Sequence, residues 1–408
     1  MNDKIQPSGR PPLYFQMSRT ARLPDPFKLA RYQKSPDLGP RPLFFSGGTA
    51  LRTLSRELIR YTHNSIHIIT PFDSGGSSAE LRNAFHMPAV GDIRNRLMAL
   101  ADQSFQGQPE IFDLFVHRLA KDSAEERLAA KIARMARGTH PLVSRIPEPM
   151  CQIIRSHLDT FLNHMPASFS LKGASIGNLI LAAGYLDNHR LLDPIIYTIS
   201  NLVQARGTVR PVVADDRHLA AELASGELII GQHQLTGKET RPIASQIHRL
   251  YLCQSSTDAA PAEVEISSGM RSLIQSAELI CYPMGSFYSS IIANLLPQGV
   301  GDAISRINCP KIYIPNTGKD PESYGLDPTR QTEILLSYLK ADDPEKIGNQ
   351  AVLNLVLVDK KHGKYAGPID EERLNALGIE VIDYPLITKE SAPNIAADRL
   401  AECLLSMT

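Results

Sequence analysis

Glycines follow three apolar runs that have the composition of buried β-strands. The segments are Ser46-Gly47-Gly48-Thr49, Asp73-Ser74-Gly75-Gly76-Ser77-Ser78 and Pro283-Met284-Gly285-Ser286. Because glycine has no Cβ, a phosphate can come close to backbone N–H groups at the start of the helix that follows. The carboxyl ends of parallel strands meet at one edge of an open α/β sheet, and ligands bind there. The three segments together predict a phosphate site, although each glycine turn taken singly also has a purely steric explanation.

The second segment carries an acid directly after its strand. Asp73 is suited to holding Mg²⁺, while Gly75, Gly76 and Ser77 offer N–H and O–H donors to a phosphate. In the competing interpretation Asp73 or Ser74 is the N-cap of the next helix, since Asp and Ser are preferred caps. The residues alone leave both interpretations open.

Two more polar positions are candidates for ligand contacts. Arg94 and Asn95 stand near the start of a predicted helix, where substrate recognition competes with an ordinary solvated helix start. Arg94 joins Asp73 as a candidate catalytic residue. Asn316 follows the predicted strand "KIYIP" and is placed to bond a base or sugar, whereas a single asparagine there is more often a turn residue.

The chain lacks the sequence motifs of other common catalytic and binding sites. It has no GxGxxG after a strand, no GxxxxGK[ST], no HExxH and no GxSxG. Its five cysteines lie far apart and its histidines lack metal-ligand spacing. Lys plus Arg equals Asp plus Glu, at 43 each, so no basic field predicts a nucleic-acid surface. Glycine loops without a P-loop lysine favour a phosphate-containing ligand over ATP hydrolysis.

The composition also predicts a cellular setting. The first residues lack the apolar core of a signal peptide, and the apolar stretches are too short to span a membrane. Unpaired cysteines in apolar runs fit a reducing compartment. We therefore expect a soluble cytoplasmic protein with neither a membrane nor a nucleic-acid partner.

The elements that must position these residues alternate along the chain. Residues 1–42 are rich in proline and arginine and predict an irregular arm, packed on the body through Leu13, Tyr14 and Phe15. Residues 43–408 predict one α/β domain. It opens with the strand "PLFF", the helix "TALRTLSRELIRY" and the strand "SIHIIT", the order of a right-handed βαβ unit in a parallel sheet.

The middle of the chain is helical and the end alternates again. Residues from about 91 to about 170 predict a helical insertion without strands. "GELIIGQHQLTG" and "IHRLYLC" predict antiparallel additions at a sheet edge. "SFYSSIIANLL" predicts a helix within the second alternating series, which starts with the strand "AELICYP". The pattern predicts a doubly wound, mainly parallel sheet with a helical insertion.

The blocks "DSGGSSAELR" and "GDIRNRLMALA" resemble the signature of the CofD/YvcK family, which has a DDGGSSGxLR-like stretch followed by PGDIRN. Matching blocks continue in order through "SIGNLILAAGYL", "GSFYSSIIANLL" and "PKIYIPNTGKDPESYGL", from about residue 43 to about residue 340. The length and the arm suggest the divergent CofD-related branch. The resemblance implies a three-layer α/β/α Rossmann-like fold.

The resemblance also implies an activity and its alternative. CofD is a 2-phospho-L-lactate transferase. It moves a phospholactyl-type or phosphoenolpyruvyl group from a guanosine-diphosphate-activated donor to a deazaflavin hydroxyl, with Mg²⁺ and release of GMP. YvcK proteins resemble it but bind UDP-sugars as regulators without known catalysis. The implied partner is a nucleoside-diphosphate-linked small molecule, of GDP or UDP type, with Mg²⁺ as cofactor. A homodimer is compatible with either activity.

Carried over by position, the family motifs assign roles to residues of this chain. Gly47, Gly48 and Thr49 would cradle phosphate, and Asp73 would be the acid associated with the metal. Gly285 and Ser286 would form the second phosphate loop, and Asn316 would lie near the nucleotide.

Departures from the family pattern bear on catalysis. Ala50 replaces a glycine of GGTG, Ser74 replaces the second Asp of DDGGSS, and Ala293 replaces the proline of PNLL. The loss of one carboxylate weakens Mg²⁺ binding, although Mg²⁺ commonly uses one carboxylate together with ligand phosphates. Ser74 thus favours the regulatory binder, whereas the retention of Asp73 and of the Arg94–Asn95 pair keeps the transferase a candidate.

Overall fold

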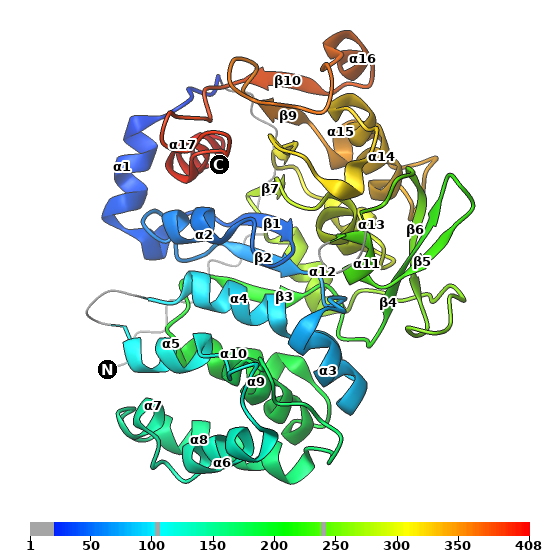
Figure 1. Ribbon diagram of the computed structural model, residues 1–408. Coiled ribbons are helices and arrows are strands. Elements are labelled where there is room, and N and C mark those ends of the chain that lie inside the picture. The colour runs from blue at the N-terminus through cyan, green and yellow to red at the C-terminus, as the bar shows by residue number, and fades with distance from the viewer. Residues whose placement is uncertain (1–19, 103–106, 238–241) are drawn as a thin grey trace, which may run out of the picture.

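A seven-stranded parallel sheet forms the centre of the protein (Figure 1). The computed structural model describes residues 20–102, 107–237 and 242–408. The strand order is β10-β9-β8-β7-β1-β2-β3. The strands are β1 (Pro42–Ser46), β2 (Ile66–Ile69), β3 (Thr208–Pro211), β7 (Leu279–Tyr282), β8 (Lys311–Tyr313), β9 (Leu355–Val358) and β10 (Glu380–Asp383). The chain winds outward from β1 to β3, returns, and winds the other way from β7. The predicted doubly wound parallel sheet is confirmed.

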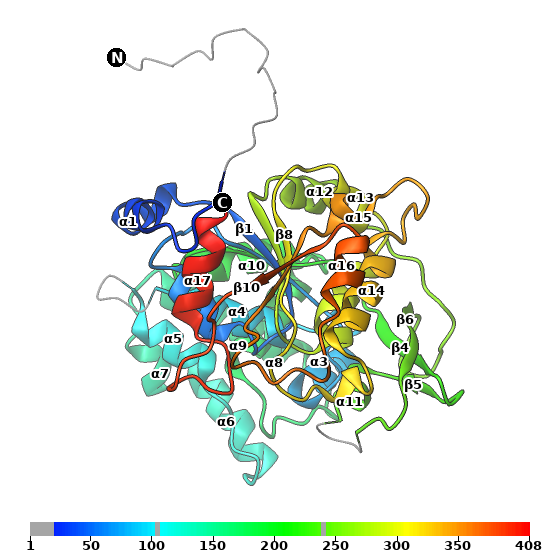
Figure 2. The ribbon, with the colours of Figure 1, turned by 90° about the horizontal axis from the view of Figure 1, so that it is seen from above.

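Helices cover both faces of this sheet (Figure 2). The β1 residues Leu43 and Phe45 point to one face, and Phe44 between them points to the other, as the alternation of side chains along a strand requires. The first face packs against α12 (Ser268–Gln275), α13 (Val300–Ser305), α14 (Pro328–Leu339), α15 (Asn349–Val352) and α16 (Glu371–Ala376). The second packs against α1 (Pro26–Lys34), α2 (Arg52–Leu58) and α17 (Ala397–Ser406). Burial on both faces explains the uninterrupted apolar composition of the strands.

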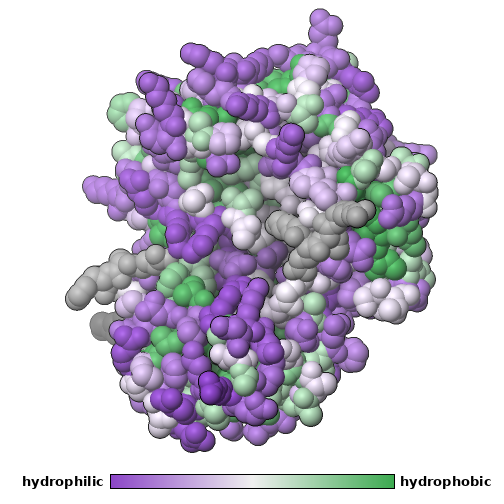
Figure 3. Space-filling model, viewed as in Figure 1, coloured by the Kyte–Doolittle hydropathy of each residue, from purple (hydrophilic) through white to green (hydrophobic). Residues whose placement is uncertain are grey.

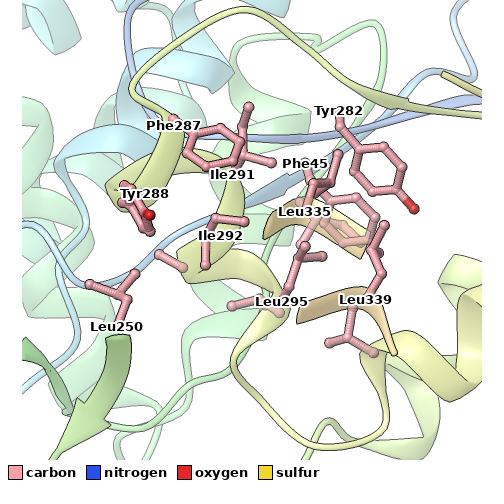
Figure 4. Packing of buried hydrophobic residues seen from close by; sticks show 14 of the residues in the cluster. Phe45, Leu250, Tyr282, Phe287, Tyr288, Ile291, Ile292, Leu295, Leu335 and Leu339 are labelled. Carbon is pink, nitrogen blue, oxygen red and sulfur yellow. The ribbon is translucent and has the colours of Figure 1, made fainter. Parts of the chain in front are cut away.

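The core on the first face includes the segment after the third glycine motif (Figure 4). Phe45 and Tyr282 stack there with ring centroids 5.8 Å apart. Phe287–Ile291 forms a π-helical turn, η2, and Ile292–Leu295 forms a 3₁₀ turn, η3. The regular helix predicted for this segment is therefore wrong. The two turns bury most of their side chains, so packing determines their backbone conformation more than the hydrogen-bond pattern of a regular α-helix does.

Between β2 and β3 the described residues form helices joined by loops, with no strand of either sheet, and these helices make a lobe below the sheet in Figure 1. It comprises α3 (Gly76–Phe85), α4 (Gly91–Leu100), α5 (Pro109–Val116), α6 (Glu125–Ala136), α7 (Pro141–Ser144), α8 (Met150–His164), α9 (Ile176–Asp187) and α10 (Leu192–Leu202). The run is longer than the predicted insertion over residues 91–170, because α9 and α10 share its apolar core. In the described ranges, no helix has the length and apolar character to cross a membrane.

A separate three-stranded antiparallel sheet packs beside the main one. It contains β5 (Leu228–Ile230), β4 (His218–Leu223) and β6 (Ile247–Cys253), in that order. The prediction that these strands extend the main sheet edge is wrong. Leu219, Ala221 and Leu223 face inward and join the first core, so this sheet packs face-on. Hydrophobic residues show over β5 and β6 at the right edge of Figure 3. Within β5, Leu228 is 46% exposed.

The predicted arm is not irregular throughout its length, since it contains α1. Asp25 Oδ1 accepts hydrogen bonds from the N–H groups of Phe27 and Lys28, both at 3.1 Å, and Pro26 occupies the first turn. Both are helix-start signals that the proline-rich composition obscured. Lys28 Nζ then donates to the Ser406 carbonyl at 2.9 Å and ties α1 to α17. The expected packing of residues 13–15 lies outside the described residues.

The core of the helical lobe yields a stability prediction. The Phe161 ring lies 5.9 Å from that of Phe85 and 5.5 Å from that of Phe169, and its side chain is fully buried. Phe161→Ala should lower the free energy of unfolding by about 3–5 kcal/mol, through lost burial and a residual cavity. Phe27→Ala, at a ring that is 79% exposed, should change it by less than about 0.5 kcal/mol. Equal destabilisation of the two variants in urea titrations would contradict the buried position of Phe161 in the core of the lobe.

Candidate functional site

A cavity of about 300 Å³ lies at the carboxyl ends of β1, β2 and β7. This is the point where the strand order reverses, since β1 lies between β2 and β7. The loops that leave neighbouring strands here separate to opposite sides and leave a crevice for a ligand. The predicted site residues that line it are Gly47, Gly48, Thr49, Asp73, Gly75, Gly76, Ser77, Arg94, Asn95, Gly285 and Ser286. Asn316 does not line it.

The first glycine loop packs closely against the start of α4. A Cβ at Gly48 would overlap Asp92 Oδ1, and a Cβ at Gly47 would come 2.5 Å from Ser290 Oγ. Any larger residue would push the loop away from both neighbours. Glycine is therefore required at both positions, because the Asp92 and Ser290 side chains lie too close to the loop for a Cβ. The closer of the two is the Asp92 carboxylate, at Gly48.

A buried arginine lies beneath this loop. Arg96 on α4 is fully buried and donates to the Ser46 hydroxyl at 3.2 Å, to the Gly47 carbonyl at 3.0 Å and to the Ser55 hydroxyl. Burial lowers the pKa of Arg96 to about 10, and Asp92 opposes the shift. Sequence reasoning missed this residue, because an arginine within an amphipathic helix ordinarily faces solvent.

Three helices begin at the cavity without a side-chain cap. They are α3, α4 and α9, and the residues of their first turns that line the cavity are Gly76, Gly91 and Asn178. The helix macrodipole gives each N-terminus a partial positive charge. These helix ends share the cavity wall with the carboxylates of Asp73 and Asp92, and the first N–H of α9 already donates to the His117 carbonyl.

The cap interpretation of Asp73 and Ser74 is wrong, because Gly75 is the N-cap of α3. Asp73 Oδ1 instead accepts a hydrogen bond from the Gly75 N–H at 3.1 Å, within the loop. Ser74 Oγ lies 2.8 Å from Nδ1 of His233, a cavity residue that sequence reasoning also missed. Arg82 on α3 holds this loop, since it donates to the carbonyl of Asp73 at 3.3 Å.

Arg94 and Asn178 form the wall on the side of the helical lobe. The Arg94 guanidinium donates to Ser175 Oγ and, at 2.5 Å, to Asn95 Oδ1. Asn178 donates to Ser77 Oγ at 3.1 Å. Arg94 Nε and Asn178 Oδ1 are buried and have no partner among the described residues. The sequence analysis named the block "SIGNLILAAGYL" but missed Asn178 as a cavity residue, because its partners lie far away in the chain.

The second predicted phosphate loop is largely occupied by the protein itself. Asp320 accepts from the Phe287 N–H at 2.8 Å, and Glu322 accepts from those of Tyr288 and Ser289 at 3.0 and 2.7 Å. These carboxylates take the place at the start of η2 that a phosphate would take.

The same holds for the glycine of this loop. Asn316 accepts from the Gly285 N–H at 2.9 Å and donates to the Gly285 carbonyl. Asn316 therefore positions the loop, and the expectation that it lies near the nucleotide has no support from the cavity lining. Gly285 and Ser286 line the cavity, with the Gly285 amide already bonded.

Comparison with known proteins places this geometry in a family. A family model described as 2-phospho-L-lactate transferase CofD matches residues 43–387. The "Gluconeogenesis factor" of Bacillus subtilis is 28% identical over 365 residues, which cover 86% of this chain and 92% of that protein. A "Putative gluconeogenesis factor" of Thermoanaerobacterium thermosulfurigenes is 28% identical, over 90% of this chain and 97% of its own.

A solved structure shares the fold. It is that of a UPF0052 family protein from Bacillus halodurans, with a TM-score of 0.65 and 23% identity. The match covers 90% of this chain and 99% of that chain. The predicted resemblance to the CofD/YvcK family is confirmed by these findings together.

The tight loop gives a matched pair of glycine variants. Gly48→Ala should lower the free energy of unfolding by about 1–3 kcal/mol, because its Cβ would displace Asp92 from the loop. Gly318→Ala, where a Cβ would have no neighbour within 4 Å, should change it by less than about 0.5 kcal/mol. Thermal or urea unfolding of both variants checks this. A Gly48→Ala protein as stable as wild type would mean that the loop does not need its glycine.

Glu322 gives a pH prediction. Burial, and then the charge of Asp320, raises the pKa of Glu322 from its ordinary 4.5 to about 7. The folded protein therefore binds this proton more readily than the unfolded chain, and its stability falls as pH rises from about 4.5 to about 7. Glu322→Gln keeps acceptor and donor atoms for Tyr288 and Ser289 but cannot titrate. Its free energy of unfolding should fall less than that of wild type over this range, and equal slopes would contradict the shift.

Proposed function

The chain belongs to the CofD family, and from that premise we propose that it is a CofD-like transferase. The proposed reaction moves a phospholactyl- or phosphoenolpyruvyl-type group from a nucleoside-diphosphate-activated donor to an acceptor hydroxyl and releases the nucleoside monophosphate. The observation that carries the proposal is the set of three uncapped helix N-termini at one cavity at the switch point of the sheet.

The diphosphate would lie between the first glycine loop and the starts of α3 and α4. Gly75, Gly76 and Ser77 offer backbone and hydroxyl donors there, and Gly91 stands at the start of α4. Donors fixed before the ligand arrives stabilise developing charge without reorganisation. Arg96 adds a buried positive charge behind the loop and fixes the Gly47 carbonyl. The role of these groups is to hold the diphosphate as the monophosphate leaves.

The cavity residues fit Mg²⁺ as a cofactor. Asp73 lines the cavity with a carboxylate, and the buried Asn178 Oδ1 has no partner in the described part of the chain. Both are the hard oxygen donors that Mg²⁺ prefers. The described ranges contain no cluster of three His, Cys, Asp or Glu, so the remaining ligands would come from phosphates and water. When bound, Mg²⁺ would neutralise charge on the diphosphate.

The acceptor hydroxyl would be positioned by the wall on the lobe side. Arg94 retains N–H donors beyond those used by Ser175 and Asn95, since a guanidinium has five. Phosphoryl transfer depends mainly on position and charge neutralisation, so a strong general base is not required. His233, held against Ser74, stands at the same cavity.

A regulatory binder of nucleotide sugars, like YvcK, is the second candidate. The observation in its favour is Ser74, which bonds to His233 where the family motif has a second carboxylate. The relatives named gluconeogenesis factor have a name that states no transferase activity. Such a protein would use the same cavity without a metal-dependent reaction.

A panel of nucleotides separates the two functions. We expect GDP with Mg²⁺ to raise the melting temperature of this protein, because a ligand that binds only the folded state stabilises it by mass action, about 2.7 kcal/mol at a hundred times Kd. The panel contains GDP, GTP, UDP-N-acetylglucosamine and ADP, each with and without Mg²⁺. Stabilisation by the UDP-sugar alone and without metal would favour the regulator. No response to any member would overturn both.

Asp73 tests the metal assignment. Asp73→Asn should abolish the Mg²⁺-dependent part of the nucleotide response and leave the fold intact, since an amide oxygen can still accept from the Gly75 N–H. Asp122→Asn, at an exposed acid in the helical lobe, is the matched control and should respond as wild type. If Asp73→Asn keeps the full Mg²⁺-dependent response in the thermal assay, Asp73 is not the metal ligand.

A further inference from the structure

We propose that the cavity contains a second anion site, formed by Arg94 and Arg118, that binds a carboxylate or phosphate group of the acceptor. The identification of this ligand as the acceptor rests on the proposed transferase function. The site lies where α9 begins, beside α4, on the side of the cavity contributed by the helical lobe.

Arg94 is a buried charge whose hydrogen-bond partners are neutral. It is only 5% exposed, and it donates to Ser175 and Asn95. In the described part of the chain its Nε has no partner. The nearby acid is Asp92, whose charge offsets part of the cost of burying this guanidinium. A ligand anion that pairs with Arg94 would offset the remainder.

The fold makes room for this arginine. A Cβ at Gly177 on α9 would come 2.8 Å from Arg94 Cδ and 2.7 Å from the carbonyl of Phe115. Ser175, the N-cap residue of α9, accepts from Arg94 and caps no N–H of its own helix. The first turn of α9 is thus built around the guanidinium, and its N-terminal dipole adds to the positive charge.

Arg118 adds a second positive charge at the same place. It lines the cavity, is exposed, and donates to the carbonyl of Gly173 at 3.2 Å. Burial lowers the pKa of Arg94 to about 10, and the charge of Arg118 lowers it further, opposed by Asp92. Two guanidiniums that line one side of the cavity favour an anionic ligand there.

Asn178 indicates what else the ligand carries. Its Oδ1 is a buried acceptor without a partner among the described residues, one helical turn after Ser175. In the proposed reaction this oxygen binds either Mg²⁺ or the acceptor hydroxyl. The proposed transfer requires a hydroxyl in any case, so the ligand class is an alcohol that also bears a carboxylate or phosphate for Arg94 and Arg118.

Glycerol 3-phosphate is a suitable probe, with glycerol as its neutral counterpart. Calorimetric titration of the wild-type chain should show binding of glycerol 3-phosphate and none of glycerol. Arg118→Gln should raise the Kd for glycerol 3-phosphate at least about tenfold, because it removes charge-assisted hydrogen bonds. Arg127→Gln, at an exposed arginine of α6 in the same lobe, should leave the Kd unchanged. Arg94→Lys keeps the charge but loses the two parallel N–H donors of the guanidinium, so it should also raise the Kd for glycerol 3-phosphate.

The outcomes separate this site from the proposed function. Binding that saturating Mg²⁺–GDP leaves intact supports an acceptor site, whereas competition would assign the anion to the nucleotide and overturn the proposal. Absence of binding to wild type, or equal Kd values for Arg118→Gln and Arg127→Gln, would also overturn it. Arg118-dependent binding with no response to any nucleotide would support the anion site and overturn the transferase.

Discussion

The structure depends on one constraint, which is that all seven strands of the main sheet run parallel and therefore end at one edge. Every helix that follows a strand begins near that edge, with its positive end toward the same region. The reversal of strand order between β1 and β7 opens a crevice among these ends. Like-signed helix ends gathered in one place repel each other, so the fold must either neutralise each end or leave it for a ligand.

The protein does both. At the start of η2, the carboxylates of Asp320 and Glu322 neutralise the positive end, and Asn316 satisfies Gly285. Among the described residues, no side chain caps the starts of α3, α4 and α9, although Asp92 lies in the first turn of α4. The two sides of the cavity share glycine loops and differ in their backbone donors, which are already bonded within the protein at η2 and are left without a side-chain cap at α3, α4 and α9.

The charged side chains follow the same division. Arg82 pairs with Asp216 at 2.7 Å and braces the loop of Asp73, so its charge is compensated within the protein. Arg94 and Arg96, both buried, bond to neutral groups around the cavity. Asp92 compensates part of their charge. What remains favours an anionic ligand, in agreement with membership of a family described by a phospholactate transferase. The pairing of Ser74 with His233 is where this chain departs from that pattern.

The sequence by itself determined the parallel sheet, the edge at which the site lies and the family. Continuous apolar runs, glycine segments and ordered motif blocks are local signals that survive without knowledge of the packing. The helix start at Asp25 and Pro26 was also local, and was obscured by the proline-rich composition around it.

Only the tertiary structure decided which of the predicted groups are available to a ligand. Glu322 reaches Ser289 across 33 residues, and His233 reaches Ser74 across 159. Such partners leave no periodic trace in the sequence, because packing between elements far apart in the chain selects them. Burial of Arg94 and Arg96 on a helix of ordinary composition depends on that same packing, and so does the charge of the cavity.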